Sequence, residues 1–441
     1  MIRYSRLLPL CIVGLALTGC GIGSWFDGES EPPLPGDRIA VLRSDVAVAP
    51  DPAVAQLDVV LPPAALNPDW PQAGGTPDHA PVHAQLAPSP TRIWQVSVGE
   101  GTGRGAHILS APVVANGRVF AMDAETNVSA VSAADGERLW SRSMRPENGE
   151  GGFGGGVAAV GDRVYVTTGY GGVAALDAAT GDPIWSRTLP TPIRAAPTVA
   201  EGRVYAVTVD SRTEALDAAT GQPVWTHTGI AETASVLGGA SPAVSRGAVV
   251  VPYNSGEVFG LREDNGRMVW TDSLAALRRA DVVSELAAIR GHPVAYRGLV
   301  FATSHSGRSV AIDLRSGMRI WDRDFGGVEM PWAAGDFVFM LTNRNELLAL
   351  VAAEGRVRWV NPLPRFEDPK DRSDPIVWAG PVLAGGNLIL VNSLGRAVFF
   401  SPATGEQVND LALPSGATVP PVVAGGTMFV LSGDGTLSAY R

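Results

Sequence analysis

Few side chains in this sequence are spaced for catalysis or metal binding. Among six histidines, only His79 and His83 lie at a spacing that one metal ion could share, in a Pro-rich stretch without a cysteine beside them. The Gly-rich stretches 99–105 and 149–156 are not followed by the Lys-Ser/Thr pair of a phosphate-binding loop. A Gly-x-Ser-x-Gly nucleophile motif is also absent from the sequence. We therefore expect no catalytic residue, no metal and no cofactor, and we interpret the Gly-rich stretches as turns.

Cys20 is the residue with the clearest chemical role. It ends a segment that begins with Arg3 and Arg6 and continues with apolar residues 7–17, which is typical of a secretory signal peptide and too short to cross a bilayer. The closing Leu-Thr-Gly-Cys resembles the lipobox of bacterial lipoproteins, whose cysteine is lipidated after cleavage before it. We expect residues 1–19 to be a signal peptide and Cys20 to be lipidated. An ordinary signal peptide with an incidental cysteine is the alternative.

The residues around Cys20 and the charge balance limit the location and the partners. Gly21, not aspartate, follows the cysteine, which favours the periplasmic face of the outer membrane. The formal net charge of −10 becomes −12 once the two arginines of the signal peptide are lost. Such an acidic chain, without clusters of Lys or Arg, is not suited to binding nucleic acid. Cys11 would leave with the signal peptide, so the mature chain cannot form an internal disulfide and depends on its core.

The rest of the sequence is dominated by a repeat. Residues 175–185 read ALDAATGDPIW and residues 215–225 read ALDAATGQPVW. The Gly-x-x-x-Trp ending recurs at intervals of 38 to 51 residues, with Asn409 in place of the last tryptophan. The repeated tryptophans are Trp140, Trp185, Trp225, Trp270, Trp321 and Trp359. Between them lie short alternating apolar runs separated by Gly, Asn or Asp, which predict antiparallel strands. Eight repeats of this length predict an all-β, eight-bladed β-propeller of four-stranded antiparallel blades.

The recurring residues of the repeat have a structural explanation. We expect Asp177, Asp217 and Asp313 to accept backbone N–H bonds inside a tight turn, with a glycine supplying the positive φ. The tryptophan is large enough to fill the space between one blade and the next. A row of aromatic ligand contacts is the alternative interpretation of the tryptophans.

The two ends of the repeat array complement each other. The last repeat stops at Arg441 without an outer strand, whereas residues 91–98, which include Trp94, form a strand pattern without a blade. We expect this N-terminal strand to complete the C-terminal blade and close the ring, which removes an open sheet edge. Residues 91–441 would then form one propeller domain. Residues 20–66 are interpreted as a flexible Pro-rich tether and residues 67–90 as a lead-in packed on the propeller.

The repeat resembles two families. Repeats ending Asp-x-x-Thr-Gly-x-x-x-Trp are similar to the propeller of quinoprotein dehydrogenases, which bind PQQ and Ca²⁺ on the axis and typically place adjacent cysteines there. This chain has no such cysteine pair. Together with the lipobox and the tether, the repeats most resemble the BamB family, above all in residues 298–326 (GLVFATSHSGRSVAIDLRSGMRIWDRDFG). That resemblance implies a non-catalytic scaffold that binds the POTRA domains of the barrel-forming subunit BamA and helps to deliver unfolded outer-membrane proteins.

The resemblance also implies a partner surface on two loops, residues 233–242 and 278–293. The candidate partner-binding residues are Val236, Leu237, Gly238, Gly239, Leu286, Arg290 and His292. Leu237 stands where the family often has an arginine, and Ala288 and Arg290 stand where it has acidic residues, which favours an apolar contact through Val236 and Leu237. The loops could instead be simple blade connections, and clients could add a strand to an exposed blade edge. A PQQ-dependent dehydrogenase, an axial small-ligand binder and a carbohydrate-binding or adhesion propeller are the alternative functions.

Overall fold

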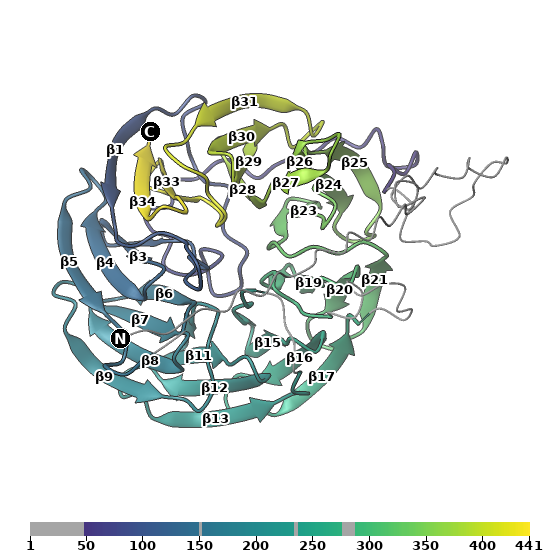
Figure 1. Ribbon diagram of the computed structural model, residues 1–441. Helices are drawn as coiled ribbons and strands as arrows, with labels where there is room; N and C mark the ends of the chain where they lie inside the picture. Colours follow the sequence, from purple (N-terminus) through teal and green to yellow (C-terminus); the bar gives the residue numbers. More distant parts are fainter. Residues whose placement is uncertain (1–47, 150–151, 233–236, 276–286) are drawn as a thin grey trace, which may run out of the picture. The chain divides into compact units, whose positions relative to one another are not determined.

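The computed structural model describes residues 48–149, 152–232, 237–275 and 287–441, which form a ring of eight blades (Figure 1). Each blade is a four-stranded antiparallel sheet, so the propeller predicted from the repeats is confirmed. In each blade we call the strands a to d, from the axis outward. Blades 1 to 4 comprise β2 (Val113–Ala115), β3 (Arg118–Met122), β4 (Asn127–Ser132) and β5 (Arg138–Ser143); β6 (Gly155–Val160), β7 (Arg163–Thr168), β8 (Gly172–Asp177) and β9 (Pro183–Thr188); β10 (Thr198–Ala200), β11 (Arg203–Val207), β12 (Arg212–Asp217) and β13 (Pro223–Thr228); and β14 (Ala243–Ser245), β15 (Ala248–Pro252), β16 (Glu257–Arg262) and β17 (Met268–Ser273).

The second half of the ring is built in the same way. Blades 5 to 7 comprise β18 (Val294–Tyr296), β19 (Leu299–Thr303), β20 (Ser309–Asp313) and β21 (Arg319–Arg323); β22 (Trp332–Ala334), β23 (Phe337–Leu341), β24 (Glu346–Val351) and β25 (Val357–Pro362); and β28 (Trp378–Ala384), β29 (Asn387–Asn392), β30 (Arg396–Phe400) and β31 (Gln407–Ala412). Blade 8 combines β32 (Val422–Ala424), β33 (Thr427–Leu431) and β34 (Thr436–Tyr440) with β1 (Arg92–Ser97). β1 pairs antiparallel with β34, so the two ends of the repeat array share one sheet.

The aspartate of the repeat caps the turn between strands c and d. Asp177 Oδ1 accepts the backbone N–H groups of Ala179 and Thr180 at 2.8 and 2.9 Å. Asp217 makes the same pair of bonds, and Asp313 accepts from the N–H and the hydroxyl of Ser316. These hydrogen bonds favour the ionised carboxylate and hold the pKa of each aspartate below its usual value.

The tryptophan of the repeat joins each blade to the following one. Its indole N–H donates to a carbonyl in the next c–d turn, as from Trp185 Nε1 to Ala218 O at 3.1 Å. The glycine of that turn lies under the ring: a Cβ on Gly221 would be 2.5 Å from Trp185 Cε3, and Gly221 has φ +70°. Equivalent indole bonds are made by Trp94, Trp140, Trp225, Trp270, Trp321 and Trp359. The turn therefore requires glycine at this position for two reasons: the positive φ and the absence of a side chain under the indole ring.

The segment that crosses the ends of the inner strands begins before the predicted lead-in of residues 67–90, within the predicted tether. From here on we use the name lead-in for residues 60–86, which contact all eight blades. Trp70 forms a two-way backbone pair with Val114 in blade 1 and stacks on Trp332 of blade 6 with ring centroids 6.0 Å apart. The remaining blades donate backbone N–H groups to the lead-in at 2.7 to 2.9 Å: Ala159 N to Pro71 O, Val199 N to Gln72 Oε1, Val244 N to Pro77 O, Ala295 N to Asp78 O, Gly385 N to Ala84 O and Gly425 N to Asn67 O. His83 donates from Nδ1 to Pro62 O and accepts from Gly386 N at Nε2, both at 2.8 Å.

Contacts with the propeller already begin before the lead-in, within the segment interpreted as a tether. Asp51 N donates to Val357 O of β25 at 2.8 Å, and Arg358 Nε donates to Leu57 O at 2.8 Å. Val54 is 4% exposed. Residues 51–58 therefore lie along the outer strand of blade 6.

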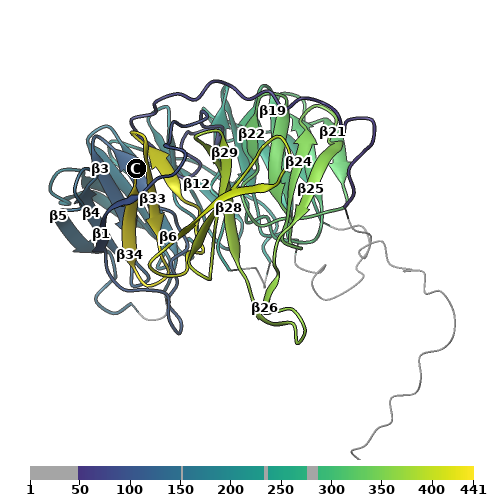
Figure 2. The ribbon, with the colours of Figure 1, turned by 90° about the horizontal axis from the view of Figure 1, so that it is seen from above.

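The meander topology gives the ring two distinct faces. The lead-in face carries the a–b and c–d turns and the lead-in itself, and the loop face carries the b–c turns and the connections between blades. Figure 2 shows the lead-in, in purple, and the connection after β25 on opposite sides of the ring. This connection contains an additional hairpin, β26 (Phe366–Asp368) and β27 (Ser373–Pro375). Residues 367–375 are all exposed, and they include Lys370, the one lysine in the 441-residue sequence.

Candidate functional site on the loop face

The two loops that the sequence singles out meet on the loop face. Leu237 is 42% exposed, whereas Gly238 is buried, and a Cβ on Gly238 would lie 2.9 Å from Arg290 Nε. The Arg290 side chain therefore packs directly on the first loop, and only a residue without a side chain fits beneath it. Cys20, Val236 and Leu286 lie outside the described residues.

Arg290 connects this contact to a buried carboxylate that no sequence motif marks. Its Nη2 atom lies 4.0 Å from Glu329 Oε1, and the Glu329 side chain is 9% exposed. Glu329 Oε2 accepts the backbone N–H of Gly380 at 3.2 Å. Burial raises the pKa of Glu329 to about 7, against the opposing attraction of Arg290. Arg290 thus ties the first loop to an acid on the axis and acts as a positioning residue for this surface.

His292 faces inward and does not belong to the exposed part of the surface. Its Nδ1 accepts the backbone N–H of Ser241 at 2.8 Å, and its ring lies 5.3 Å from that of His79. Burial, with the nearby His79 and Arg290, lowers the pKa of His292 to about 3. Burial likewise lowers the pKa of His79, whose Nδ1 donates to Pro293 O at 2.8 Å, to about 4. Both imidazoles are neutral at pH 7 and hold the lead-in and the two loops together.

Further hydrogen bonds fix the end of the second loop. Ile289 N donates to Tyr253 O of blade 4 at 3.4 Å, and His305 N of blade 5 donates to Ala288 O at 3.0 Å. Ala288 and Ile289 are each 1% exposed. The described part of the second loop is therefore anchored to two blades. Leu237 and the exposed part of the Arg290 side chain remain accessible to a partner.

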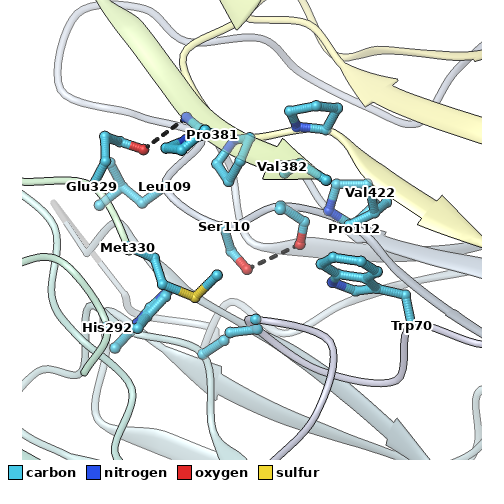
Figure 3. A pocket seen from close by; sticks show the side chains of 18 of the residues that line it. Trp70, Leu109, Ser110, Pro112, His292, Glu329, Met330, Pro381, Val382 and Val422 are labelled. Carbon is cyan, nitrogen blue, oxygen red and sulfur yellow. Dashed lines mark hydrogen bonds between the residues drawn. The ribbon is translucent and has the colours of Figure 1, made fainter. Parts of the chain in front are cut away.

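A cavity on the axis lies directly behind this site (Figure 3). Trp70, Ala73 and Gly74 of the lead-in form one end. The walls include Ser110, His292, Glu329 and Met330 from the connections and Pro381 from β28. Its volume is about 80 Å³, room for several water molecules. Pockets for cofactor-sized molecules hold about 300–1,000 Å³, so these side chains do not fit a quinone cofactor on the axis.

Within the described ranges, no group of three His, Cys, Asp or Glu side chains is placed to hold a metal ion. In the same part of the chain, no helix is long and apolar enough to cross a membrane. The Gly-rich stretch 99–105 falls in the connection β1–β2. Of the stretch 149–156, Gly155 and Gly156 begin strand β6, so the interpretation as a turn is wrong for these two residues, and residues 150–151 lie outside the described part.

The geometry defines a class: a propeller of PQQ-enzyme-type repeats whose axis is capped on one face and whose connections are tied together on the other. Solved propellers share the fold. The BamB structure from Moraxella catarrhalis aligns over 80% of this chain and 100% of its own at TM-score 0.65 and 17% identity. The quinohemoprotein alcohol dehydrogenase from Comamonas testosteroni aligns over 86% of this chain and 81% of its own at TM-score 0.65 and 15% identity.

Sequence comparison identifies the family. The family model described as outer membrane protein assembly factor BamB matches residues 124–361. The outer membrane protein assembly factor BamB of Salmonella typhimurium is 31% identical over 359 residues, which cover 80% of this chain and 88% of the relative. The chain belongs to the BamB family, as the resemblance carried by the lipobox, the tether and the repeats predicted.

Proposed function

We propose that the protein is a non-catalytic scaffold of the machinery that assembles β-barrel proteins in the outer membrane, held at the periplasmic face by a lipid on Cys20. The observation that carries this function is the family membership, since relatives matched over most of their length bear the name of an outer-membrane assembly factor. A preorganised loop face on a rigid ring supports a binding function, because such loops recognise partners without a large ordering cost.

The proposed partner is the barrel-forming subunit, BamA, bound through its POTRA domains, with unfolded outer-membrane proteins as clients. The proposed contact surface is centred on Leu237, next to the contact between Gly238 and Arg290. An exposed leucine on a positioned loop suits a small apolar contact at the centre of such an interface. The charge pairing common in the family is replaced here by this leucine.

The rigidity of the ring is part of the proposal. Residues 91–441 act as one propeller domain, and β1 closes the ring through its pairing with β34. Trp94 Nε1 donates to Ala133 O of blade 1 at 3.2 Å, which supports a continuous contact between the last blade and the first. A closed ring exposes no unpaired blade face and keeps the loops at fixed separations.

The experiment is affinity purification of the C-terminally tagged protein from gently solubilised outer membranes, with co-purifying proteins identified by mass spectrometry. The test variant is Leu237→Asp, and the matched control is Met318→Asp, which changes a 64% exposed side chain on the lead-in face. We expect the barrel-forming subunit with the wild type and the control, and a loss of at least tenfold with Leu237→Asp. Arg290→Glu is unsuitable as a surface probe because it would place a second carboxylate beside Glu329.

Each outcome decides a different part of the proposal. Equal recovery with all three proteins would keep the function but refute the Leu237 surface. Complete absence of the subunit would refute the scaffold function. A quinoprotein-type dehydrogenase, which the small axial cavity disfavours, would then be tested by adding PQQ with Ca²⁺ and an alcohol or sugar and following dye reduction.

A further inference from the structure

A second pocket, distinct from the axial cavity, lies on the lead-in face between blades 5 and 6. It holds about 490 Å³, within the range of pockets that bind small molecules or single large side chains. Its walls include Tyr296, Leu299, Phe301, Phe337 and Val351, and residues 57–58 lie at its edge. Nothing in the loop-face proposal uses this space.

Blade 5 lines this pocket with a leucine at a position where three other blades carry an arginine. The first residue of strand b faces the c–d turn of the next blade, and in blades 1 to 3 it is Arg118, Arg163 or Arg203. Arg163 Nη1 donates to Ala218 O and Ala219 O of that turn at 3.0 and 3.1 Å. The corresponding residue of blade 5 is Leu299, paired with Asp313 as Arg163 is paired with Asp177.

The residue two positions further along strand b is also apolar in blade 5. Tyr165 of blade 2 donates its hydroxyl to Ala218 O at 3.2 Å, whereas blade 5 has Phe301 at this position. In both blades the repeat tryptophan still donates to the turn, from Trp185 to Ala218 O and from Trp321 to Ala352 O. Two hydrogen-bonding side chains are thus replaced by two apolar ones, and the volume of the arginine is left open. The result is an apolar pocket and not a polar contact.

The charges at its edge restrict the occupant. Among the described residues that line it, the charged ones are Asp58, Arg297 and Asp336, and Arg297 is paired with Asp336 at 2.9 Å. A cation free to meet a carboxylate or phosphate headgroup is therefore missing from this lining, and the surplus charge of Asp58 is negative. An uncharged apolar group is favoured over an anionic lipid.

The chain itself shows how a polypeptide can lie here. Residues 51–58 run along β25, held through Asp51 N to Val357 O and through Arg358 Nε to Leu57 O. Leu57 lies at the pocket and is still 44% exposed, so this segment leaves most of the space empty. An extended segment with alternating apolar side chains could insert one of them into the remaining space.

We propose that this inter-blade pocket binds an aromatic side chain of an extended, unfolded outer-membrane polypeptide. The proposal rests on the proposed function, which supplies such clients. Strands of outer-membrane barrels alternate apolar and polar residues and carry aromatic residues at both membrane interfaces. Such segments match an aromatic-lined pocket beside a surface that already accepts another stretch of chain.

The test uses the full chain and a fluorescently labelled decapeptide in which Thr alternates with Leu and Phe, followed by fluorescence anisotropy. Leu299→Arg restores the residue of blades 1 to 3 and fills the pocket. Ala248→Arg makes the same change at the corresponding position of blade 4 and serves as the control. We expect Leu299→Arg to raise the Kd at least tenfold and Ala248→Arg to leave it within twofold. Equal binding by Leu299→Arg, or equal binding of a peptide with Ser in place of Phe, overturns the proposal.

A second measurement does not depend on how well the arginine variant folds. Leu57→Cys, in a chain whose Cys11 and Cys20 are replaced by Ser, carries an environment-sensitive fluorophore at the pocket. The peptide should shift its emission, and the Phe-free peptide should not. If uncharged hexadecanol shifts the emission and the peptide does not, the pocket is a lipid site and the proposal is wrong.

The scaffold function is tested separately in the same proteins. Leu299→Arg should still co-purify with the barrel-forming subunit, because the variant lies on the face opposite Leu237. Loss of peptide binding with retained co-purification supports the pocket. Retained peptide binding in a protein that never co-purifies with the subunit refutes the proposed function while leaving the pocket supported.

Discussion

At the scale of a residue, the contact between a tryptophan and the glycine of the next blade explains why these two residue types recur at a fixed spacing. The indole ring packs on the c–d turn of the next blade and donates its N–H to a carbonyl of that turn. Both contacts require a tight turn. The aspartate tightens the turn, and the glycine makes room for the ring. Each blade interface therefore includes this specific contact in addition to its buried apolar area.

The matched pair Gly221→Ala and Gly202→Ala tests this explanation in one blade. Gly202 has φ +73°, and no atom lies within 4 Å of the point that a methyl group on it would occupy, so its substitution should cost only the backbone strain, about 1–2 kcal/mol. Gly221→Ala adds a clash with Trp185 and should cost about 1–3 kcal/mol more. Urea unfolding of both variants measures the difference. Equal losses would contradict the role given to the tryptophan contact.

The buried titratable residues behind the loop face predict a pH dependence of stability. His79 and His292 have folded pKa values of about 4 and about 3, below their unfolded value of 6.5, so their contribution is lost as pH falls below 6.5. The pKa of Glu329 is raised from 4.5 to about 7, so the folded form retains a proton there and stability falls as pH rises between these values. The two effects oppose each other between pH 5 and 6.5.

Glu329→Gln removes the contribution of Glu329 to this pH dependence and leaves the contribution of the two histidines. Between pH 5 and 6.5, its free energy of unfolding should fall with decreasing pH more steeply than that of the wild type, by about 1.4 kcal/mol per pH unit. Urea unfolding at four pH values measures the two slopes. Glu406→Gln, an exposed acid in blade 7, should leave the slope unchanged. Parallel slopes for Glu329→Gln and the wild type would show that Glu329 titrates normally.

At the scale of an element, the lead-in acts as a common strap for the inner strands. Its bonds are mostly backbone to backbone, so they depend on the path of the chain and only locally on side-chain type. Gln72, His79 and His83 add side-chain hydrogen bonds. Trp70 contributes by packing, since it is 4% exposed, stacks on Trp332 and closes one end of the axial cavity.

Trp70→Ala should therefore destabilise the whole ring. A buried tryptophan reduced to alanine costs about 3–5 kcal/mol. Leu66→Ala, nearby but 63% exposed, should stay within about 0.5 kcal/mol of the wild type. Thermal and urea unfolding provide the measurement, and similar values for the two variants would mean that the lead-in is only loosely coupled to the blades.

At the scale of the whole molecule, we propose that β1 closes the ring as the outer strand of blade 8, where it pairs with β34 and its Trp94 packs on Phe429 of β33. Ser97 and Thr436 are opposite each other in that register. Cysteines there, in a chain with Cys11 and Cys20 replaced by Ser, should form a disulfide on oxidation, because directly opposed residues are close enough. The bond closes a very long loop and should stabilise the protein by about 3–5 kcal/mol over its reduced form. Failure to form it, or no gain in the unfolding midpoint, would argue against ring closure by β1.

The sequence predicts the propeller well because its signal is local and repeated: the glycine of the c–d turn and the tryptophan of the outer strand recur in nearly every blade, and the aspartate recurs in three. Glu329 escapes prediction because its importance comes from Arg290 and Gly380, which are distant in sequence. The position of Glu329 within the repeat is nevertheless unusual. Glu329 is two residues before the proline that precedes an inner strand, where other blades have Ser110, Ala195 or Ala240.

The N-terminal segment is the harder case for a different reason. Residues 51–58 follow β25 through backbone groups, which every residue possesses, so no periodic pattern marks their contacts. Their Pro-rich composition favours a tether, although Val54 is buried. By contrast, an alignment of the repeats shows that Leu299 stands where blades 1 to 3 have an arginine. That this replacement leaves a pocket open becomes clear only from the position of the c–d turn of the next blade.

The hairpin after β25 has a practical consequence. Because Lys370 is the sole lysine and is exposed at its turn, an amine-acylating reagent would modify one side chain in the chain, apart from the amino terminus. Immobilised or dye-labelled through that amine, every molecule would be attached by the loop face with its lead-in face turned outward. The protein thereby carries a single chemical handle, which could orient it on a sensor surface and report distances from one defined point.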